Sequence, residues 1–152
     1  MTAQSKTMHA SAVLVGARAV LIRGPSASGK SRLALELIEA ARAGSLPFAR
    51  LVADDRVYLE AAGGRLLARP AEALAGLIEV RGVGLLRMAY EPSAVVGLVV
   101  DLAAADASRL PDAERRRTEI GGILLPRLAV AADAAALPSV LTLLNSPRES
   151  WI

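Results

Sequence analysis

The chain has 152 residues, 53% of them hydrophobic and only 3% aromatic, which favours one domain with an aliphatic core. The net charge is only +3, and the single basic cluster, residues 115–117, lies among acidic residues, which argues against nucleic-acid binding. The chain has no cysteine, no N-terminal apolar leader and no apolar run of about eighteen residues, so we expect a cytoplasmic protein without disulfides, signal peptide or membrane span.

The first predicted elements are a flexible tail over residues 1–7 and two antiparallel strands. Residues 9–15 form the first apolar strand, residues 16–18 make a tight turn, and residues 19–23 return as the second strand. The second strand leads into a segment of the form G-x-x-x-x-G-K-S, the phosphate-binding P-loop motif. The candidate phosphate-binding residues are Gly24, Pro25, Ser26, Ala27, Ser28, Gly29, Lys30 and Ser31.

The context of this motif supports phosphate binding. A helix is predicted over residues 31–43 with Gly44 as its stop, so the motif joins a strand to a helix. The first N–H groups of a helix lack partners and carry partial positive charge, which suits a phosphate group. Lys30 can reach a terminal phosphate and the Ser31 hydroxyl can hold Mg²⁺. Of eighteen basic residues only Lys6 and Lys30 are lysines, so lysine is present where the motif requires it.

Two adjacent carboxylates follow the next strand. Residues 48–53 are predicted as a strand that ends in Asp54 and Asp55. A strand, a helix and a second strand with short connections form a parallel βαβ unit, whose strands share their carboxyl edge. Ligands of open α/β sheets bind along that edge. We therefore expect both carboxylates to face the phosphate site, one holding Mg²⁺ and the other taking the proton of an acceptor hydroxyl.

The rest of the chain is predicted to complete an α/β fold, a mixed sheet with flanking helices. In chain order its elements are a hairpin (56–60 and 65–68), a short turn or helix (70–76), an interrupted apolar stretch (77–86), a buried strand (94–101), a polar loop or edge (111–118), an apolar segment (123–131) and a closing helix (138–145).

Five further residues are candidates with bland alternatives. Asp101 ends a hydrophobic strand as a Walker B carboxylate would, although a strand-capping role is our preferred interpretation. Glu79 and Arg81 alternate with apolar neighbours, so both are predicted to lie on one face of a strand. The alternative to a role in the site is a solvent-facing ion pair that contributes little to stability. His9 stands near the N-terminus, and nothing local decides the role of Arg127.

Taken together, these segments resemble the catalytic domain of HPr kinase/phosphorylase over about residues 8–131. The matching segments, in the family's order, are His9-Ala10-Ser11, the P-loop with the helix start at residues 31–38, Leu51 to Asp55, Ile78 to Gly84 with its Glu-x-Arg-Gly core, and Pro126 to Val130. The P-loop alone is weakly specific; the acidic motif and the Glu-x-Arg-Gly segment at these distances make the resemblance strong. It implies a P-loop fold related in shape to PEP carboxykinase.

The resemblance also implies a reaction and roles for residues. ATP would phosphorylate a serine of the phosphocarrier HPr, and inorganic phosphate would reverse the transfer and release pyrophosphate. Asp54 would be the proton acceptor, with His9 beside it tuning its proton affinity. Ser31, Asp55 and Glu79 would hold Mg²⁺. How the two aspartates divide these roles is a hypothesis.

The resemblance gives Arg81 and Arg127 the task of neutralising charge on the transferring group or the incoming substrate. The chain would correspond to a short form without the family's additional N-terminal domain and with a short C-terminal part, so a homo-oligomeric state stays open. Two alternatives also remain open: a P-loop kinase of a small hydroxylated metabolite, and a nucleotide-binding regulatory module without catalysis. The adjacent carboxylates, Asp54 and Asp55, argue against the second alternative.

Overall fold

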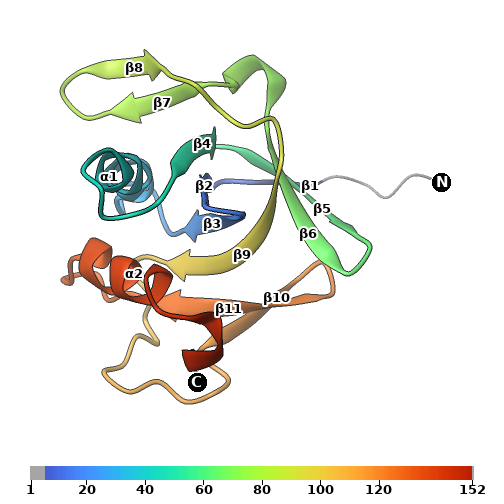
Figure 1. Ribbon diagram of the computed structural model, residues 1–152, viewed down its shortest axis with the longest axis vertical. Helices are drawn as coiled ribbons and strands as arrows, with labels where there is room; N and C mark the ends of the chain where they lie inside the picture. The colour runs from blue at the N-terminus through green and yellow to red at the C-terminus, as the bar shows by residue number, and fades with distance from the viewer. Residues whose placement is uncertain (1–5, 152) are drawn as a thin grey trace.

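The computed structural model describes residues 6–151 and has an α/β architecture, a curled sheet covered on one side by helices (Figure 1). The strands are β1 (Lys6–Met8), β2 (Ser11–Val15), β3 (Arg18–Arg23), β4 (Ala49–Ala53), β5 (Val57–Ala62), β6 (Arg65–Pro70), β7 (Leu77–Val80), β8 (Gly84–Arg87), β9 (Ala94–Asp101), β10 (Arg117–Ile120) and β11 (Ile123–Ala129). The helices are α1 (Lys30–Arg42) and α2 (Ala136–Leu144), with short 3₁₀ turns at Glu72–Leu74 and Arg148–Ser150.

Among the described residues, nine strands form one sheet whose main path runs β1-β5-β6-β9-β3-β2-β4. β9 is parallel to β3 along one side. Its other side is shared, because β6 pairs antiparallel with the start of β9 and β11 pairs parallel with its end. β10 extends β11 as an antiparallel neighbour, and β7 and β8 form a separate two-stranded hairpin.

The predicted parallel relation of β3 and β4 is present, but the two strands are not neighbours. β2 lies between them and is antiparallel to both. Its amino end therefore lies at the edge where β3 and β4 have their carboxyl ends. Three chain segments meet at this edge: the residues before β2, the loop after β3 and the residues after β4.

The sheet is buried on both faces, with the side chains of β3 alternating between two apolar clusters. Val20 and Ile22 pack in the cluster that contains α1 and α2, whereas Ala19 and Leu21 pack in the cluster on the opposite face. α1 packs on the sheet through apolar side chains that include Leu33 and Leu37. α2 packs on the same side of the sheet (Figure 1). This packing holds the carboxyl ends of β3 and β4 and the start of α1 in a fixed relation.

The fold class and most elements agree with the sequence predictions, apart from shifts of a few residues at several element ends and the following details. Residues 1–5 of the predicted tail lie outside the described residues, and residues 6–8 form β1, which pairs with β5. The stretch at 77–86 is the β7–β8 hairpin with a turn at residues 81–83. The closing helix begins at Ala136, two residues before the predicted start. Within residues 6–151 no helix is long and apolar enough to cross a membrane.

Candidate active site

The loop of residues 24–31 joins β3 to α1 and requires glycine at two positions. Gly24 has a φ of 158°, and a Cβ atom there would lie 2.5 Å from the Ser28 Oγ and 3.1 Å from the carbonyl oxygen of Leu102. Gly29 has a φ of 100°, in the left-handed region that favours glycine. A side chain at position 24 would thus enter the space that the loop encloses.

This loop fits a phosphate group. α1 begins without a hydrogen bond from a capping side chain, and its first turn has no acidic residue. The hydroxyl of Ser28 is buried and has no hydrogen-bond partner among the described residues. Free N–H groups at a helix start, together with an unpartnered hydroxyl, are donors that phosphate oxygens satisfy. The geometry therefore suits the phosphate chain of a nucleotide.

Lys30 lies folded against the same loop. Its side chain is buried, and Nζ donates to the carbonyl oxygens of Gly24 at 2.9 Å and Pro25 at 3.0 Å. These two carbonyls hold the ammonium group in the loop, close to the helix start where an anion would bind. The predicted role of Lys30 in phosphate binding requires it to exchange these carbonyls for phosphate oxygens.

Asp54 is the centre of the site. It is only 4% exposed, and its carboxylate accepts hydrogen bonds from the hydroxyls of Ser11 at 2.6 Å and Ser31 at 2.7 and 2.9 Å. The backbone N–H of Glu79 adds a third donor at 3.0 Å. The three donors come from β2, α1 and β7, so one buried carboxylate joins three segments that are distant in the sequence.

Asp55 faces solvent and pairs with His9. Its side chain is 61% exposed, and its Oδ1 lies 2.7 Å from Nε2 of His9. The backbone of Asp55 has a φ of 70°, which turns the chain directly after Asp54 and gives the two carboxylates different surroundings. The imidazole of His9 was expected to interact with Asp54. In the structure it hydrogen-bonds to the next residue, Asp55, so the expected partner is corrected.

The residues predicted to hold Mg²⁺ are divided between these two surroundings. Ser31 contacts Asp54, while Asp55 contacts His9. Glu79 reaches Asp54 through its backbone N–H, and its side chain is exposed. Within residues 6–151 no three His, Asp or Glu side chains gather as a ready-made metal site. Ser31 and Asp54 are nevertheless an oxygen pair of the kind that Mg²⁺ uses together with substrate phosphates.

Arg81 occupies a different position from the predicted one. It is exposed in the turn between β7 and β8, one residue beyond the end of β7, so it does not share a strand face with Glu79. The turn interrupts the alternation on which the prediction rested. The hairpin that carries Arg81 is nonetheless held to the site through the hydrogen bond between Glu79 and Asp54.

Arg127 is engaged in ion pairs. Its side chain is 12% exposed; it bonds to Asp101 through Nε and to Asp106 at 2.8 and 2.9 Å through its two Nη atoms. Asp101 also accepts from Arg23 at 2.7 and 2.8 Å. Asp101 ends β9 next to β3, the strand before loop 24–31, which is where a Walker B carboxylate would lie. Both of its carboxylate oxygens accept hydrogen bonds from arginines, which agrees with the preferred strand-capping interpretation.

The charges of this network reinforce one another. Burial alone would raise the pKa of Asp101, but hydrogen bonds from Arg23 and Arg127 outweigh burial and lower the pKa below its ordinary value. The hydrogen bond with Asp106 raises the pKa of Arg127 although burial acts in the opposite direction. Asp101, Asp106 and Arg127 are therefore charged at neutral pH.

Sequence reasoning did not assign three residues that the structure brings into play. Ser11 was visible as a lone hydroxyl in an apolar strand start, and Arg23 as a charge at the end of a buried strand. Asp106 carries no local signal, because its pairing with Arg127 spans 21 residues of chain.

The chain is similar to known proteins over most of its length. A family model described as "HPr Serine kinase C-terminal domain" matches residues 1–135. The chain is 32% identical to an HPr kinase/phosphorylase of Streptococcus thermophilus (strain LMD-9) and 33% identical to one of Streptococcus pneumoniae (strain Hungary19A-6), each over 150 residues. Both matches cover 91% of this chain and 46% of the relative. The chain therefore spans about half the length of the curated relatives it matches.

One solved structure resembles this protein over nearly the whole length of both chains. The structure described as "Hpr(Ser) kinase/phosphatase from Coxiella burnetii" is 25% identical with a TM-score of 0.72, and the match covers 91% of this chain and 93% of that one. The two chains thus share their fold over most of their length.

Proposed function

The chain belongs to the HPr serine kinase C-terminal domain family, and on this basis we propose that it transfers the terminal phosphoryl group of ATP to a serine of HPr in the cytoplasm, and that it catalyses the reverse phosphorolysis. The observation that carries the proposal is the contact of Ser31 with Asp54 directly beside the uncapped start of α1, with the His9–Asp55 pair following Asp54 in the chain.

The nucleotide phosphates would bind in loop 24–31. The N–H groups at the start of α1, the free hydroxyl of Ser28 and the ammonium of Lys30 would be the donors. Ser31 and Asp54 would hold Mg²⁺, which supplies charge neutralisation between the phosphates when bound.

We assign proton transfer to Asp55 and His9, which exchanges the roles that the resemblance implied for the two aspartates. A general base must lie within hydrogen-bond reach of the acceptor hydroxyl. Asp54 is buried and already accepts three donor groups, whereas Asp55 is 61% exposed and, among residues 6–151, is bonded through Oδ1 to His9 with Oδ2 open. The Oδ2 of Asp55 would take the serine proton, and His9 would orient the carboxylate through its hydrogen bond to Oδ1.

The reverse direction uses the same groups. Inorganic phosphate in loop 24–31 would attack the phosphoserine phosphorus, the bond between phosphorus and the serine oxygen would break, and pyrophosphate would form. Asp55 would take a proton from the attacking inorganic phosphate and pass it to the departing serine oxygen. The products are then free serine and pyrophosphate, with every proton and the phosphoryl group accounted for.

The two predicted arginines would act differently. Arg81 is exposed in the β7–β8 turn and is open to contact with a substrate. Arg127 pairs with Asp101 and Asp106, so we give it a positioning role in fixing the end of β9 beside the P-loop strand. Direct contact of Arg127 with a phosphate would first require these ion pairs to open.

The β7–β8 hairpin favours a protein acceptor over a small metabolite. Val83 and Leu85 are 65% and 67% exposed on a hairpin whose Glu79 N–H donates to Asp54, the carboxylate proposed to hold Mg²⁺. Exposed apolar side chains beside a polar site are typical of a protein-binding surface. We propose that this hairpin contacts HPr during transfer.

The test combines the chain, Mg²⁺-ATP and HPr from the same organism, and measures the mass of HPr. The expected result is a gain of one phosphoryl group on serine. A second incubation of phospho-HPr with inorganic phosphate should release pyrophosphate. If HPr stays unmodified while a small hydroxylated compound is phosphorylated, the metabolite-kinase alternative replaces the proposal; nucleotide binding without any transfer would indicate a regulatory module.

A further inference from the structure

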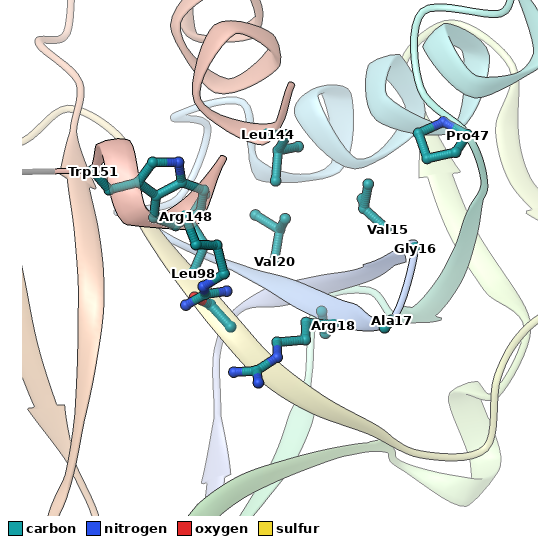
Figure 2. A pocket seen from close by; sticks show the side chains of 12 residues that line it. Val15, Gly16, Ala17, Arg18, Val20, Pro47, Leu98, Leu144, Arg148 and Trp151 are labelled. Carbon is teal, nitrogen blue, oxygen red and sulfur yellow. The ribbon is translucent and has the colours of Figure 1, made fainter. Parts of the chain in front are cut away.

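A second pocket lies at the opposite end of β3 from the P-loop, with a cavity volume of about 230 Å³ (Figure 2). β3 begins at Arg18 in this pocket and ends at Arg23, directly before the P-loop. At about 3.3 Å per residue, the strand separates the two places by about 17 Å. A ligand in this pocket, here named the arginine pocket, would therefore not occupy the nucleotide site.

Two arginines approach each other in the arginine pocket. Figure 2 shows Arg148 from the C-terminal segment and Arg18 from β3 on the same side of the pocket, with Trp151 next to Arg148. The guanidinium carbon of Arg148 lies 4.7 Å from the centre of the Trp151 ring. Arg148 Nη2 donates to the carbonyl oxygen of Gly97 at 3.0 Å.

The backbone at Gly97 is adapted to this pair of side chains. The pairing of β3 with β9 shifts register at this point, as in a β-bulge. A Cβ atom at Gly97 would lie 2.7 Å from Cβ of Arg18, 2.8 Å from its Cδ and 3.0 Å from Nη1 of Arg148. Both arginines thus lie against one spot of bare backbone that glycine alone leaves open.

The positive charge of the pair has no acidic partner in the described part of the chain. Among residues 6–151, neither Arg18 nor Arg148 forms an ion pair with a carboxylate. Burial and the nearby charge of Arg18 lower the pKa of Arg148 from its ordinary value. The two guanidinium groups repel each other, with partial screening by solvent because both residues are exposed, and an anion bound between them would relieve this repulsion.

The remaining wall defines the rest of the ligand. It is formed by Val15, Val20, Pro47, Leu98 and Leu144, and none of the residues lining the pocket has a hydroxyl, amide or carboxyl side chain. The indole N–H of Trp151 already donates to the carbonyl oxygen of Ser146. A polyhydroxylated anion such as a sugar phosphate would leave its hydroxyls unpaired against this wall, whereas an apolar body would be matched.

We propose that the arginine pocket binds a small amphipathic carboxylate, with its anionic head between the guanidinium groups of Arg18 and Arg148 and its aliphatic or aromatic body against the apolar wall. The planar forks of the two arginines present several free N–H donors that match carboxylate geometry. The site is independent of phosphoryl transfer, so it stands or falls separately from the proposed function.

The test uses NMR titration of the ¹⁵N-labelled chain with three probes: 4-methylpentanoate, its neutral amide and inorganic phosphate. The carboxylate should produce saturable shifts of the Gly97 amide and the Trp151 indole N–H. The amide lacks the charge and should bind about tenfold more weakly or not at all. Phosphate lacks the apolar body and should also bind more weakly. Equal binding of the amide or tighter binding of phosphate would overturn the proposal, as would the absence of saturable shifts with the carboxylate.

Variants locate the binding. Arg18→Gln removes one charge from an exposed side chain with no described ion-pair partner, so the fold is expected to persist, and affinity for the carboxylate should fall about tenfold. Arg65→Gln removes the same charge from an exposed residue at the start of β6 and should leave affinity unchanged. Gly97→Ala should also weaken binding, because its methyl group displaces both arginines. An unchanged affinity in Arg18→Gln would refute the assignment.

Discussion

The hydroxyl of Ser31 donates to both carboxylate oxygens of Asp54, at 2.7 and 2.9 Å, and thereby joins the start of α1 to the end of β4. The two residues are 23 positions apart, and the helix between them returns the chain to the same sheet edge. This contact places two oxygen ligands for the proposed Mg²⁺ at the edge where the phosphates would bind.

Asp54→Asn should raise the Mg²⁺ concentration needed for half-maximal phosphoryl transfer by about tenfold or more, because an amide oxygen is a weaker ligand and the contact with Ser31 changes. The matched variant Asp55→Asn should keep the Mg²⁺ requirement and lower kcat by about 10²- to 10⁴-fold, as loss of a general base does. Magnesium titrations of both variants provide the measurement. The opposite pattern would return the base role to Asp54.

Gly24→Ala should raise KM for ATP by about tenfold or more. The added methyl group would lie 2.5 Å from the Ser28 Oγ and would close the loop against phosphate. Gly63→Ala is a suitable control: its φ is 60°, no atom lies within 4 Å of the added Cβ, and the residue lies in the β5–β6 turn. It should lose about 1 kcal/mol of stability from backbone strain with an unchanged KM. Steady-state kinetics and thermal unfolding separate the two effects.

Leu85→Ser should raise KM for HPr by about tenfold while KM for ATP stays the same, since the β7–β8 hairpin is proposed to contact the protein acceptor. Leu110→Ser replaces another exposed leucine, 80% exposed in the loop between β9 and β10, and should change neither constant. Equal effects of the two substitutions would show that apolar exposure in general, and not this hairpin, governs the interaction with HPr.

Asp101 should make the protein sensitive to acid. Its pKa in the folded state is below the ordinary value of 3.8, so its contribution to stability is fully present above that value and is lost as the pH falls through the lower, folded-state pKa. Asp101→Asn should therefore be less stable than the parent protein at neutral pH, by about 2 kcal/mol, with the difference shrinking below about pH 4. Chemical denaturation at several pH values measures this. A difference that stays constant down to pH 2 would contradict the proposed charge network.

Local sequence signals were enough to predict the loop 24–31, the helix after it and the position of Asp54 at the phosphate edge. Glycine spacing and apolar periodicity are set by neighbouring residues, and the direction of β4 follows from the short connections around α1. The insertion of β2 between β3 and β4 depends on strand pairing, for which the sequence carries no local mark. That insertion brings Ser11 to the site.

The partners of charged side chains were the least predictable part. The sequence could not tell that His9 bonds to Asp55 and not to Asp54, because a positive φ at Asp55 decides which carboxylate turns toward solvent. The engagement of Arg127 likewise depends on a loop whose fold places Asp106 beside it. Such pairings follow from tertiary packing, and a residue's type and neighbours do not determine them.

The folded-back position of Lys30 has a consequence for ligand selection. Its ammonium group donates hydrogen bonds to two loop carbonyls. An incoming anion must therefore replace these two neutral carbonyl oxygens as the acceptors of the ammonium N–H groups. The free energy of binding is then a difference between two sets of hydrogen bonds. A triphosphate, with several charged oxygens close together, gains more in that exchange than a singly charged ion does. The loop would thus discriminate among anions by charge density, before any contact with the base or the sugar of a nucleotide.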